Sequence, residues 1–272
     1  DSIAAEAPSV LPLQESEGQF DQRQRLSCLS SGLRTGVRKP VTISVRHRRS
    51  DMAIDLYWGS GSPYCWRVML ALEHKGIPWN SHLLKLDQQE HKAPQMLALN
   101  PRGQVPVLRD DDYVVFESVA ILYYLDLKFP QPPIFGAGPQ EAAVIMRVIQ
   151  EYQAYIEPSL RQVLEAVPEQ RTPRIDEHVT TAMHRIANEA RTIERRLSQS
   201  EWVVGERFSA ADMIIYPDIR LLLRTLQRPA ARELAARFLP LEVNYPSLAR
   251  WLQRVAALPG HARTWPPHWE PL

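Results

Sequence analysis

Two side chains near the start of a predicted helix have the types and the spacing needed for hydroxyl or thiol chemistry. Residues 59–68 read GSGSPYCWRV, so Ser62 and Cys65 lie three positions apart after a small turn. Ser62 followed by Pro63 is typical of a helix N-cap with proline at the first helical position. The same geometry lets the hydroxyl donate a hydrogen bond to an anion held at the positive end of the helix. A capping role and a binding role for Ser62 both stay open.

Cys65 lies about one turn inside this predicted helix. A thiol near a helix N-terminus can have a lowered pKa and react as the thiolate. A single cysteine in a helix is also commonly a small buried hydrophobic residue. The order S-P-Y-C is not C-x-x-C, so the segment offers no dithiol pair. A catalytic and a structural role for Cys65 therefore remain as alternatives.

Two further short segments contain residues suited to ligand binding. Residues 102–108 read RGQVPVL, and a cis bond between Val105 and Pro106 would expose the Val105 backbone to a ligand. Proline in an edge strand is the structural alternative. Glu117-Ser118 opens a predicted helix and offers N–H groups and a hydroxyl to a carboxylate. The alternative for this pair is a helix N-cap with an acidic side chain that stabilises the positive end of the helix.

The segments around these residues predict a small mixed sheet with helices on it. Strands are expected at 53–58, 79–86, 105–108 and 113–116, and helices at 63–75, 95–99 and 118–128. The acidic turn at 110–112 predicts a hairpin. The order mixes a crossover connection with a terminal hairpin, which indicates a mixed sheet and an α/β first domain.

The second half of the chain predicts an all-α domain. Residues 129–140 carry four prolines and two glycines, which predicts a linker. Helical spacing follows at 141–164, 175–197, 209–226 and 247–258, and the tail at 259–272 is expected to be irregular. Ser209 stands three positions before Asp212, which predicts a capping box with Asp in place of the usual Glu.

Composition excludes several classes of protein. The 272 residues are 44% hydrophobic and 23% charged, with a formal net charge of +1, so nothing indicates a general nucleic-acid binder. The two cysteines exclude a disulfide framework and suggest a reducing, cytoplasmic location. No apolar run is long enough for a membrane-spanning helix. Residues 1–51 are rich in Ser, Gln and Arg without periodicity, so we expect a disordered extension and folding from Met52 onward.

Together these motifs resemble one family, the cytosolic glutathione transferases. The matching pieces are SPYCWRV at 62–68, NPRGQVPVL at 100–108, ES at 117–118 and GERFSAADM at 205–213, and the likeness extends from Ile54 to about Leu258. The resemblance implies a thioredoxin-like glutathione-binding domain at 52–128 and an all-helical domain at 141–272. It also implies a homodimer that acts in detoxification, with glutathione as co-substrate and no metal.

The resemblance also implies roles for single residues. Ser62 matches the active-site serine of the tau-, zeta- and theta-like classes, which hydrogen-bonds the glutathione sulfur. Val105, before cis-Pro106, matches the residue whose backbone pairs with the cysteinyl part of glutathione. The pair at 117–118, Glu and Ser, would hold the γ-glutamyl end, and Gln104 and His91 fall where related classes place side chains toward the glycyl carboxylate.

Three functions follow as hypotheses. The first is transfer of glutathione to a small hydrophobic electrophile, which we expect to rest against aromatic side chains: Tyr57, Trp58, Tyr64, Tyr152 and Tyr155. The second is a glutathione-dependent thiol transferase or reductase that uses Cys65. Omega-like classes carry Cys at the position of Ser62, and this chain does not. The third is a non-catalytic binding module on the same fold.

Overall fold

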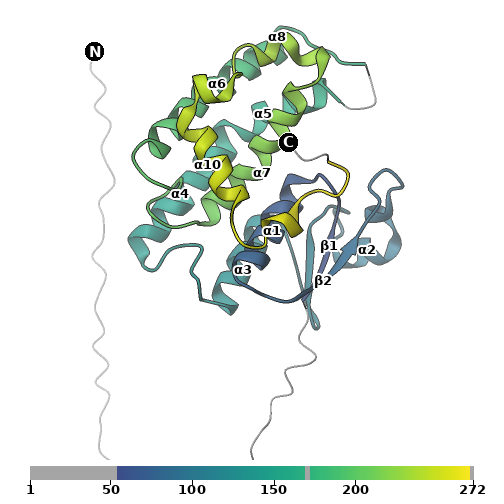
Figure 1. Ribbon diagram of the computed structural model, residues 1–272. Coiled ribbons are helices and arrows are strands. Elements are labelled where there is room, and N and C mark those ends of the chain that lie inside the picture. Colours follow the sequence, from purple (N-terminus) through teal and green to yellow (C-terminus); the bar gives the residue numbers. More distant parts are fainter. Residues whose placement is uncertain (1–53, 169–171, 270–272) are drawn as a thin grey trace, which may run out of the picture. The chain divides into compact units, whose positions relative to one another are not determined.

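The structure, a computed structural model, describes residues 54–168 and 172–269 (Figure 1). The predicted extension at 1–51 lies outside the described residues. Among the helices that the structure describes, none combines the length and the hydrophobicity needed to cross a bilayer.

A four-stranded mixed sheet forms the first half of the described chain. Its strands are β1 (Ile54–Trp58), β2 (Trp79–Leu83), β3 (Val107–Asp110) and β4 (Tyr113–Phe116), in the order β2-β1-β3-β4. β2 runs parallel to β1, whereas β3 is antiparallel to both β1 and β4. The predicted small mixed sheet with a β3–β4 hairpin is thus confirmed.

Helices α1 (Pro63–His74) and α3 (Ser118–Lys128) pack together in this half, and the short helices η1 (Glu90–Lys92) and α2 (Pro94–Leu99) follow β2. α1 begins where the sequence predicts, because Ser62 caps it and Pro63 fits its first position. It ends just before Gly76, which has a φ of 62° that favours glycine. Val68, Leu72 and Leu122 are completely buried between these helices and the sheet.

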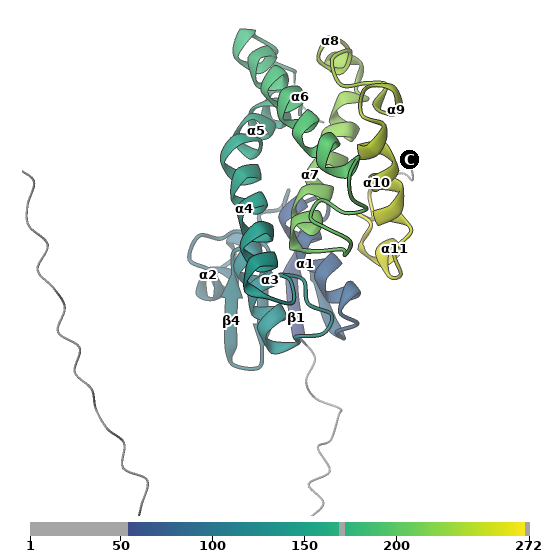
Figure 2. The same cartoon turned by 90° about the vertical axis from the view of Figure 1, so that its left-hand side faces the viewer.

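The second half is helical throughout (Figure 2). Its longer helices are α4 (Pro139–Tyr155), α5 (Glu157–Ala166), α6 (Glu177–Leu197), α7 (Ala210–Leu226) and α10 (Pro246–Ala256). Shorter ones are η2 (Pro229–Ala231), α8 (Arg232–Ala235), α9 (Leu241–Asn244) and α11 (His261–Thr264). The capping box of Ser209 and Asp212 is present at the start of α7.

Two expectations for the helical half are wrong in detail. The single helix expected at 141–164 is two helices, α4 and α5, which meet at Ile156. Pro158 has no backbone N–H to donate into a continuing helix, so it starts a new one instead. The tail expected to be irregular contains α11. Four residues are too short for helical periodicity to reveal.

A lysine with a buried side chain holds the segment that connects the two halves. Lys75 Nζ binds the Asp126 carboxylate at 2.7 Å and the backbone carbonyls of Phe129 and Pro132 at 2.8 and 2.6 Å. Asp126 in turn accepts hydrogen bonds from two backbone N–H groups further along the chain, at 2.9 and 3.0 Å. These contacts fix the segment 129–135 against α1 and α3, while α1 itself packs against α7 of the helical half.

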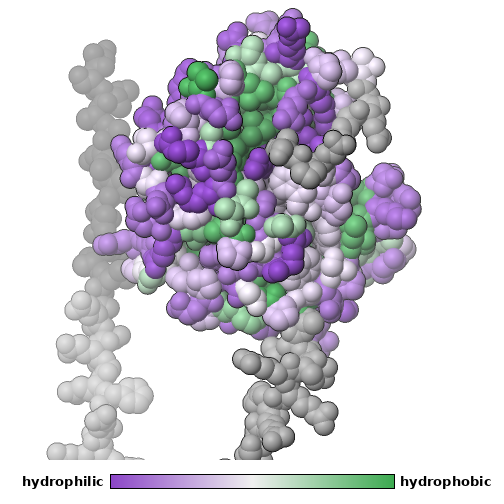
Figure 3. Space-filling model, in the orientation of Figure 1, coloured by the Kyte–Doolittle hydropathy of each residue, from purple (hydrophilic) through white to green (hydrophobic). Residues whose placement is uncertain are grey.

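Much of the molecular surface is charged or polar. The outer helices α6 and α10 each bury one apolar side and carry arginines near their C-terminal ends. Figure 3 shows a largely hydrophilic face with a hydrophobic area in its upper half, over the helical part.

Candidate functional site

Ser62 lies at the N-terminus of α1 in the N-cap position. Its Oγ accepts a hydrogen bond from the Cys65 backbone N–H at 3.4 Å, and its own N–H donates to the Gly59 carbonyl at 3.2 Å. The side chain is partly exposed. A serine that accepts one hydrogen bond still has its hydroxyl proton to donate, so Ser62 can act as cap and as anion donor at once.

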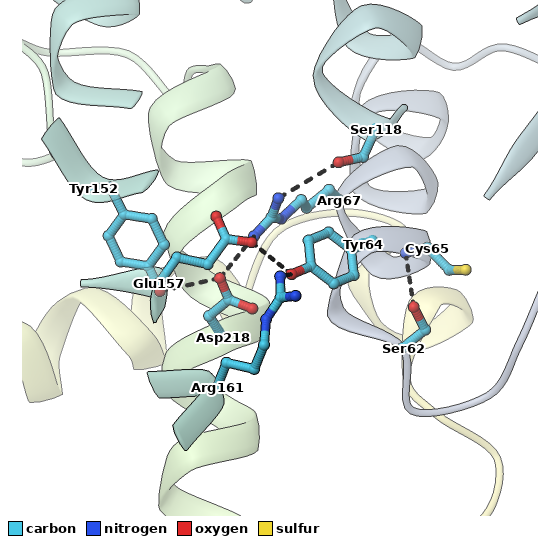
Figure 4. Close-up of polar contacts among 9 residues, drawn as sticks. All are labelled: Ser62, Tyr64, Cys65, Arg67, Ser118, Tyr152, Glu157, Arg161 and Asp218. Atoms are coloured by element: carbon cyan, nitrogen blue, oxygen red, sulfur yellow. Dashed lines mark hydrogen bonds and ion pairs between the residues drawn. The ribbon is translucent and has the colours of Figure 1, made fainter. Parts of the chain in front are cut away.

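Cys65 is placed differently from a reactive thiol. It is completely buried, its Sγ accepts a hydrogen bond from the Gly59 N–H at 3.4 Å, and burial raises the pKa of the thiol to about 11. Figure 4 shows its sulfur pointing away from Tyr64 and the polar side chains beyond it, and a hydrogen bond with the Ser62 side chain only partly offsets the effect of burial on the pKa. A protonated, inaccessible thiol is a poor nucleophile. The structure thus favours the structural role of Cys65 over the catalytic alternative.

A cavity of about 760 Å³ opens beside the start of α1 and collects most of the predicted glutathione-binding residues. Those on its wall are Gln104, Val105, Pro106, Glu117 and Ser118, together with Pro63 and Tyr64. Ser62 precedes these two directly but is not itself a lining residue. The Val105–Pro106 bond is cis. Residues from a loop, a strand end and two helix starts therefore converge on one hollow.

Glu117 has an unusual backbone conformation at the edge of this cavity. Its φ is +70°, a region that glutamate rarely adopts, and it directly precedes α3. Such a conformation costs about 1–3 kcal/mol and persists where the surrounding structure enforces it, often at functional sites. The strain orients Glu117 and the Ser118 hydroxyl toward the same hollow, where both line the wall.

A charged cluster lies at the base of the cavity and joins both halves of the molecule (Figure 4). We call it the interdomain cluster; its members are Tyr64, Arg67, Tyr152, Glu157 and Asp218. Arg67 on α1 is fully buried and pairs with Asp218 of α7 at 2.7 Å and with Glu157 of α5 at 3.6 Å. Burial opposes the charge of Arg67, but these two carboxylates raise its pKa. Burial also raises the pKa of Asp218, and the Arg67 charge counteracts that rise.

Side chains of the interdomain cluster also form hydrogen bonds at the wall of the cavity. Arg67 donates to the Ser118 Oγ at 3.4 Å, and the Tyr64 hydroxyl donates to Glu157 at 2.5 Å. Burial and the Glu157 carboxylate raise the pKa of Tyr64 to about 12, so the phenol stays protonated. Arg161 on α5 donates to the same hydroxyl at 3.1 Å. Tyr64 thus presents a fixed polar group to the cavity.

The predicted aromatic pocket is largely absent from this cavity. Trp58 and Tyr152 are buried in the core, and Tyr155 is 63% exposed. Tyr57 stacks on His82 and lines a separate hollow of about 310 Å³. Only Tyr64 of the five lies on the wall described above. Sequence patterns located these side chains on α1, α4 and β1 but did not show which side of each element faces the cavity.

The helical half supplies a wall of mixed polarity instead. Its members are Gln150, Gln153, Glu157, Leu160, Arg161, Leu164, Glu165, Asp218 and Leu221. Sequence reasoning missed these residues, including Arg67 opposite them. One signal was available: Arg67 and Asp218 each interrupt an otherwise apolar run, as a buried charged residue does.

His91 and a possible metal site need separate mention. His91 lies in η1 outside the lining of the larger cavity, and its Nδ1 is buried without a hydrogen-bond partner in the described structure. Among residues 54–168 and 172–269, no three His, Cys, Asp or Glu side chains gather in an arrangement that would hold a metal ion.

Comparison with known proteins gives consistent matches. Residues 61–128 match the glutathione S-transferase N-terminal domain, and residues 154–259 match the C-terminal domain. The chain is 29% identical over 219 residues to glutathione S-transferase A of Pleuronectes platessa, covering 79% of this chain and 92% of that protein. It is 31% identical over 168 residues to glutathione S-transferase 1 of Dianthus caryophyllus, covering 61% and 76%. The crystal structure of a glutathione S-transferase from the Antarctic clam Laternula elliptica is similar, with a TM-score of 0.69, 30% identity and coverage of 80% and 94%.

Proposed function

Because this chain belongs to the glutathione S-transferase family, we propose that its Ser62 hydroxyl holds the sulfur of glutathione as a thiolate and presents it to an electrophile. The observation that carries the proposal is the meeting of the α1 start, the 104–106 loop and the α3 start around one cavity. Ser62 directly precedes the lining residues Pro63 and Tyr64 at the N-cap of α1, and its hydroxyl proton would be donated to the sulfur.

The energetics of this step are modest. An ordinary thiol has a pKa of about 8.5, and each unit by which a site lowers that pKa requires about 1.4 kcal/mol. A hydroxyl donor together with a helix N-terminus can supply about one to two units, judged from the strengths of helix dipoles and charge-assisted hydrogen bonds. A metal or a separate general base is not required by this mechanism.

The remaining glutathione contacts are proposed from the residues around the cavity. The Val105 backbone would pair with the cysteinyl part, and Glu117 with Ser118 would hold the amino and carboxylate groups of the γ-glutamyl end. The link from Arg67 to Ser118 Oγ supports this role, because it brings positive charge next to the carboxylate position. Gln104 would face the glycyl carboxylate, and His91 would contribute from η1 as the tripeptide fills the site.

The electrophile would occupy the part of the cavity walled by α5 and α7. Leu160, Leu164 and Leu221 offer an apolar surface there, while the Arg161 guanidinium offers hydrogen-bond donors. We therefore propose a hydrophobic electrophile that carries a polar substituent as hydrogen-bond acceptor. The mixed polarity of the wall supports this refinement of the hydrophobic electrophile expected from sequence.

Ser62→Ala tests the proposal. At a pH below the pKa of the thiol, the loss of one to two pKa units of thiolate stabilisation should lower the rate of conjugation to an aryl halide about 10- to 100-fold. The matched control is Ser198→Ala, whose hydroxyl contacts only a backbone carbonyl at the end of α6. If Ser62→Ala keeps conjugation within about threefold of the parent enzyme, the serine is not the activator. Cys65→Ser in parallel should leave conjugation unchanged.

We also propose the assembly, the domain division and the location. Exposed apolar side chains on α3 and the first part of α4, namely Tyr123 (51%), Leu127 (67%) and Val144 (37%), would be covered in a homodimer. Figure 2 shows α3, β4 and the lower end of α4 in the same part of the molecule. Light scattering should give the mass of a dimer, and Leu127→Glu should lower that mass.

The domains would be 52–128 and 141–272, joined by 129–140. The enzyme would be cytoplasmic, with its single described thiol reduced.

A further inference from the structure

Residues 261–269 fold back from the helical half onto both sides of Ser62, and we propose that this segment positions the Ser62 hydroxyl for its role in catalysis. We call it the C-terminal clamp. The inference rests on the proposed function of Ser62 and adds residues that the glutathione-binding motifs do not contain. α11, at the start of the clamp, packs directly against α1 (Figure 1).

The clamp contacts the turn that precedes Ser62. His268 Nδ1 and Ser60 Oγ form a hydrogen bond of 2.6 Å. Gly61 has a φ of +79°, and a Cβ at this position would lie 2.9 Å from His268 Cε1 and 3.4 Å from Trp269 Nε1. The clamp therefore lies so close to the turn that little more than glycine fits between them.

The clamp also contacts α1 just after Ser62. Trp66, four residues further on, meets Trp265 edge to face at 5.4 Å and Trp269 at 5.5 Å. Its Nε1 donates to Thr264 Oγ1 at 2.8 Å. Trp66 and Trp269 are both buried, so these contacts are shielded from water. Ser62 is thus held between two points of contact with the same segment.

The opposite side of the clamp is anchored on α7, a helix buried in the core. Arg224 lies over the Trp269 ring at 5.1 Å, and Arg220 lies over Trp265 at 5.7 Å. His261 Nε2 and the Tyr216 hydroxyl form a hydrogen bond of 2.8 Å. The clamp therefore connects the 59–62 turn to α7, a buried helix of the helical half.

A positioning role follows from the composition of the turn. Residues 59–62 read Gly-Ser-Gly-Ser, and two glycines give this segment many backbone conformations unless neighbours restrict it. A reacting group misplaced by about 1 Å can cost about a hundredfold in rate. No clamp residue is among the described residues that line the cavity, so the clamp acts through Ser62 and touches neither substrate.

Two variants test the clamp, His268→Ala and Trp269→Leu. Each should lower kcat for conjugation about tenfold and leave KM for glutathione within about twofold, because the tripeptide contacts remain. The pH midpoint of thiolate formation, followed by ultraviolet absorbance of bound glutathione, should rise by up to about one unit. His268 is exposed, so its variant should fold normally. The matched control is Arg263→Ala in the same clamp, which pairs with Glu73 near the other end of α1 and should change neither quantity.

The outcomes separate this inference from the proposed function. A lower kcat with an unchanged pH midpoint would mean a general loss of folded enzyme, and it would overturn the positioning role. Parent-like kinetics in both clamp variants, with an impaired Ser62→Ala enzyme, would overturn the clamp alone. Full activity of Ser62→Ala would overturn the proposed function and the clamp inference together.

Discussion

Replacing Asp218 by alanine should strongly destabilise the protein, because it removes the main partner of a buried charge. The side chains of Arg67 and Asp218 are 0% and 3% exposed, and they meet at 2.7 Å. Without Asp218, the guanidinium keeps Glu157 at 3.6 Å and the neutral Ser118 hydroxyl at 3.4 Å, and the Tyr152 hydroxyl loses its 3.0 Å acceptor. The variant therefore leaves a buried positive charge without its main partner, which costs more than the loss of a surface contact.

The expected magnitude is a loss of about 3–5 kcal/mol in the free energy of unfolding, the range measured when one partner of a buried ion pair is removed. For a chain of this size, that corresponds to a drop in Tm of roughly 6–20 °C. Urea unfolding at one fixed protein concentration measures the free energy, and calorimetry measures the Tm. The fixed concentration matters because assembly would make both values concentration-dependent.

A second ion pair in the same protein provides the control. Asp55 also binds an arginine at 2.7 Å, but Arg109 is 44% exposed. Arg109→Ala, which leaves Asp55 its hydrogen bonds from Asn80 and His82, should therefore destabilise the protein far less than Asp218→Ala. The double variant Arg67→Met with Asp218→Leu removes both charges and should be more stable than Asp218→Ala alone. A loss below about 1 kcal/mol for Asp218→Ala would refute the view that Arg67 depends on this partner.

Three further results are expected. Asp212→Ala should lower the free energy of unfolding in urea by about 2–6 kcal/mol, because Trp251 Nε1 and a buried backbone N–H would each lose their acceptor at about 1–3 kcal/mol. Burial lowers the pKa of His261 to about 4, so the unfolded chain is protonated at a higher pH than the folded protein. The free energy of unfolding should therefore fall by up to about 3 kcal/mol as the pH falls from about 6.5 to 4. His261→Gln should flatten this part of the plot of unfolding free energy against pH. In a Cys28→Ser background, a thiol reagent should label Cys65 only as fast as the protein unfolds, and rapid labelling of the folded protein would contradict its burial.

Local signals predicted the elements that present the site. Ser62-Pro63 and Gly76 mark the ends of α1 because capping and positive φ depend on the residue itself and its nearest neighbours. The hairpin before α3 and the capping box of α7 were predictable for the same reason. The meeting of the 104–106 loop with the α3 start followed from the family resemblance rather than from any local pattern.

Contacts between distant segments could not be read from sequence. Arg67 and Asp218 are 151 positions apart, so no periodic pattern links them. The same limit applies to Tyr152 and Tyr155, which lie on one helix yet are buried and exposed respectively. Which side of α4 faces the cavity is decided by packing against α7, and the clamp at 261–269 depends on a return of the chain that its proline-rich sequence does not announce.

The anchoring of Lys75 has a consequence for how the enzyme meets its substrates. Lys75 holds the 129–132 segment against α1 through three oxygens, and Arg67 of α1 pairs with Asp218 of α7 at 2.7 Å across the two walls of the cavity. Together these contacts restrict the movement of one wall relative to the other. A preorganised cleft loses little conformational entropy when it is filled, so affinity for the tripeptide need not be spent on domain closure. New acceptor specificities would then arise by exchanging side chains on α5 and α7, while the contacts between the two halves stay unchanged.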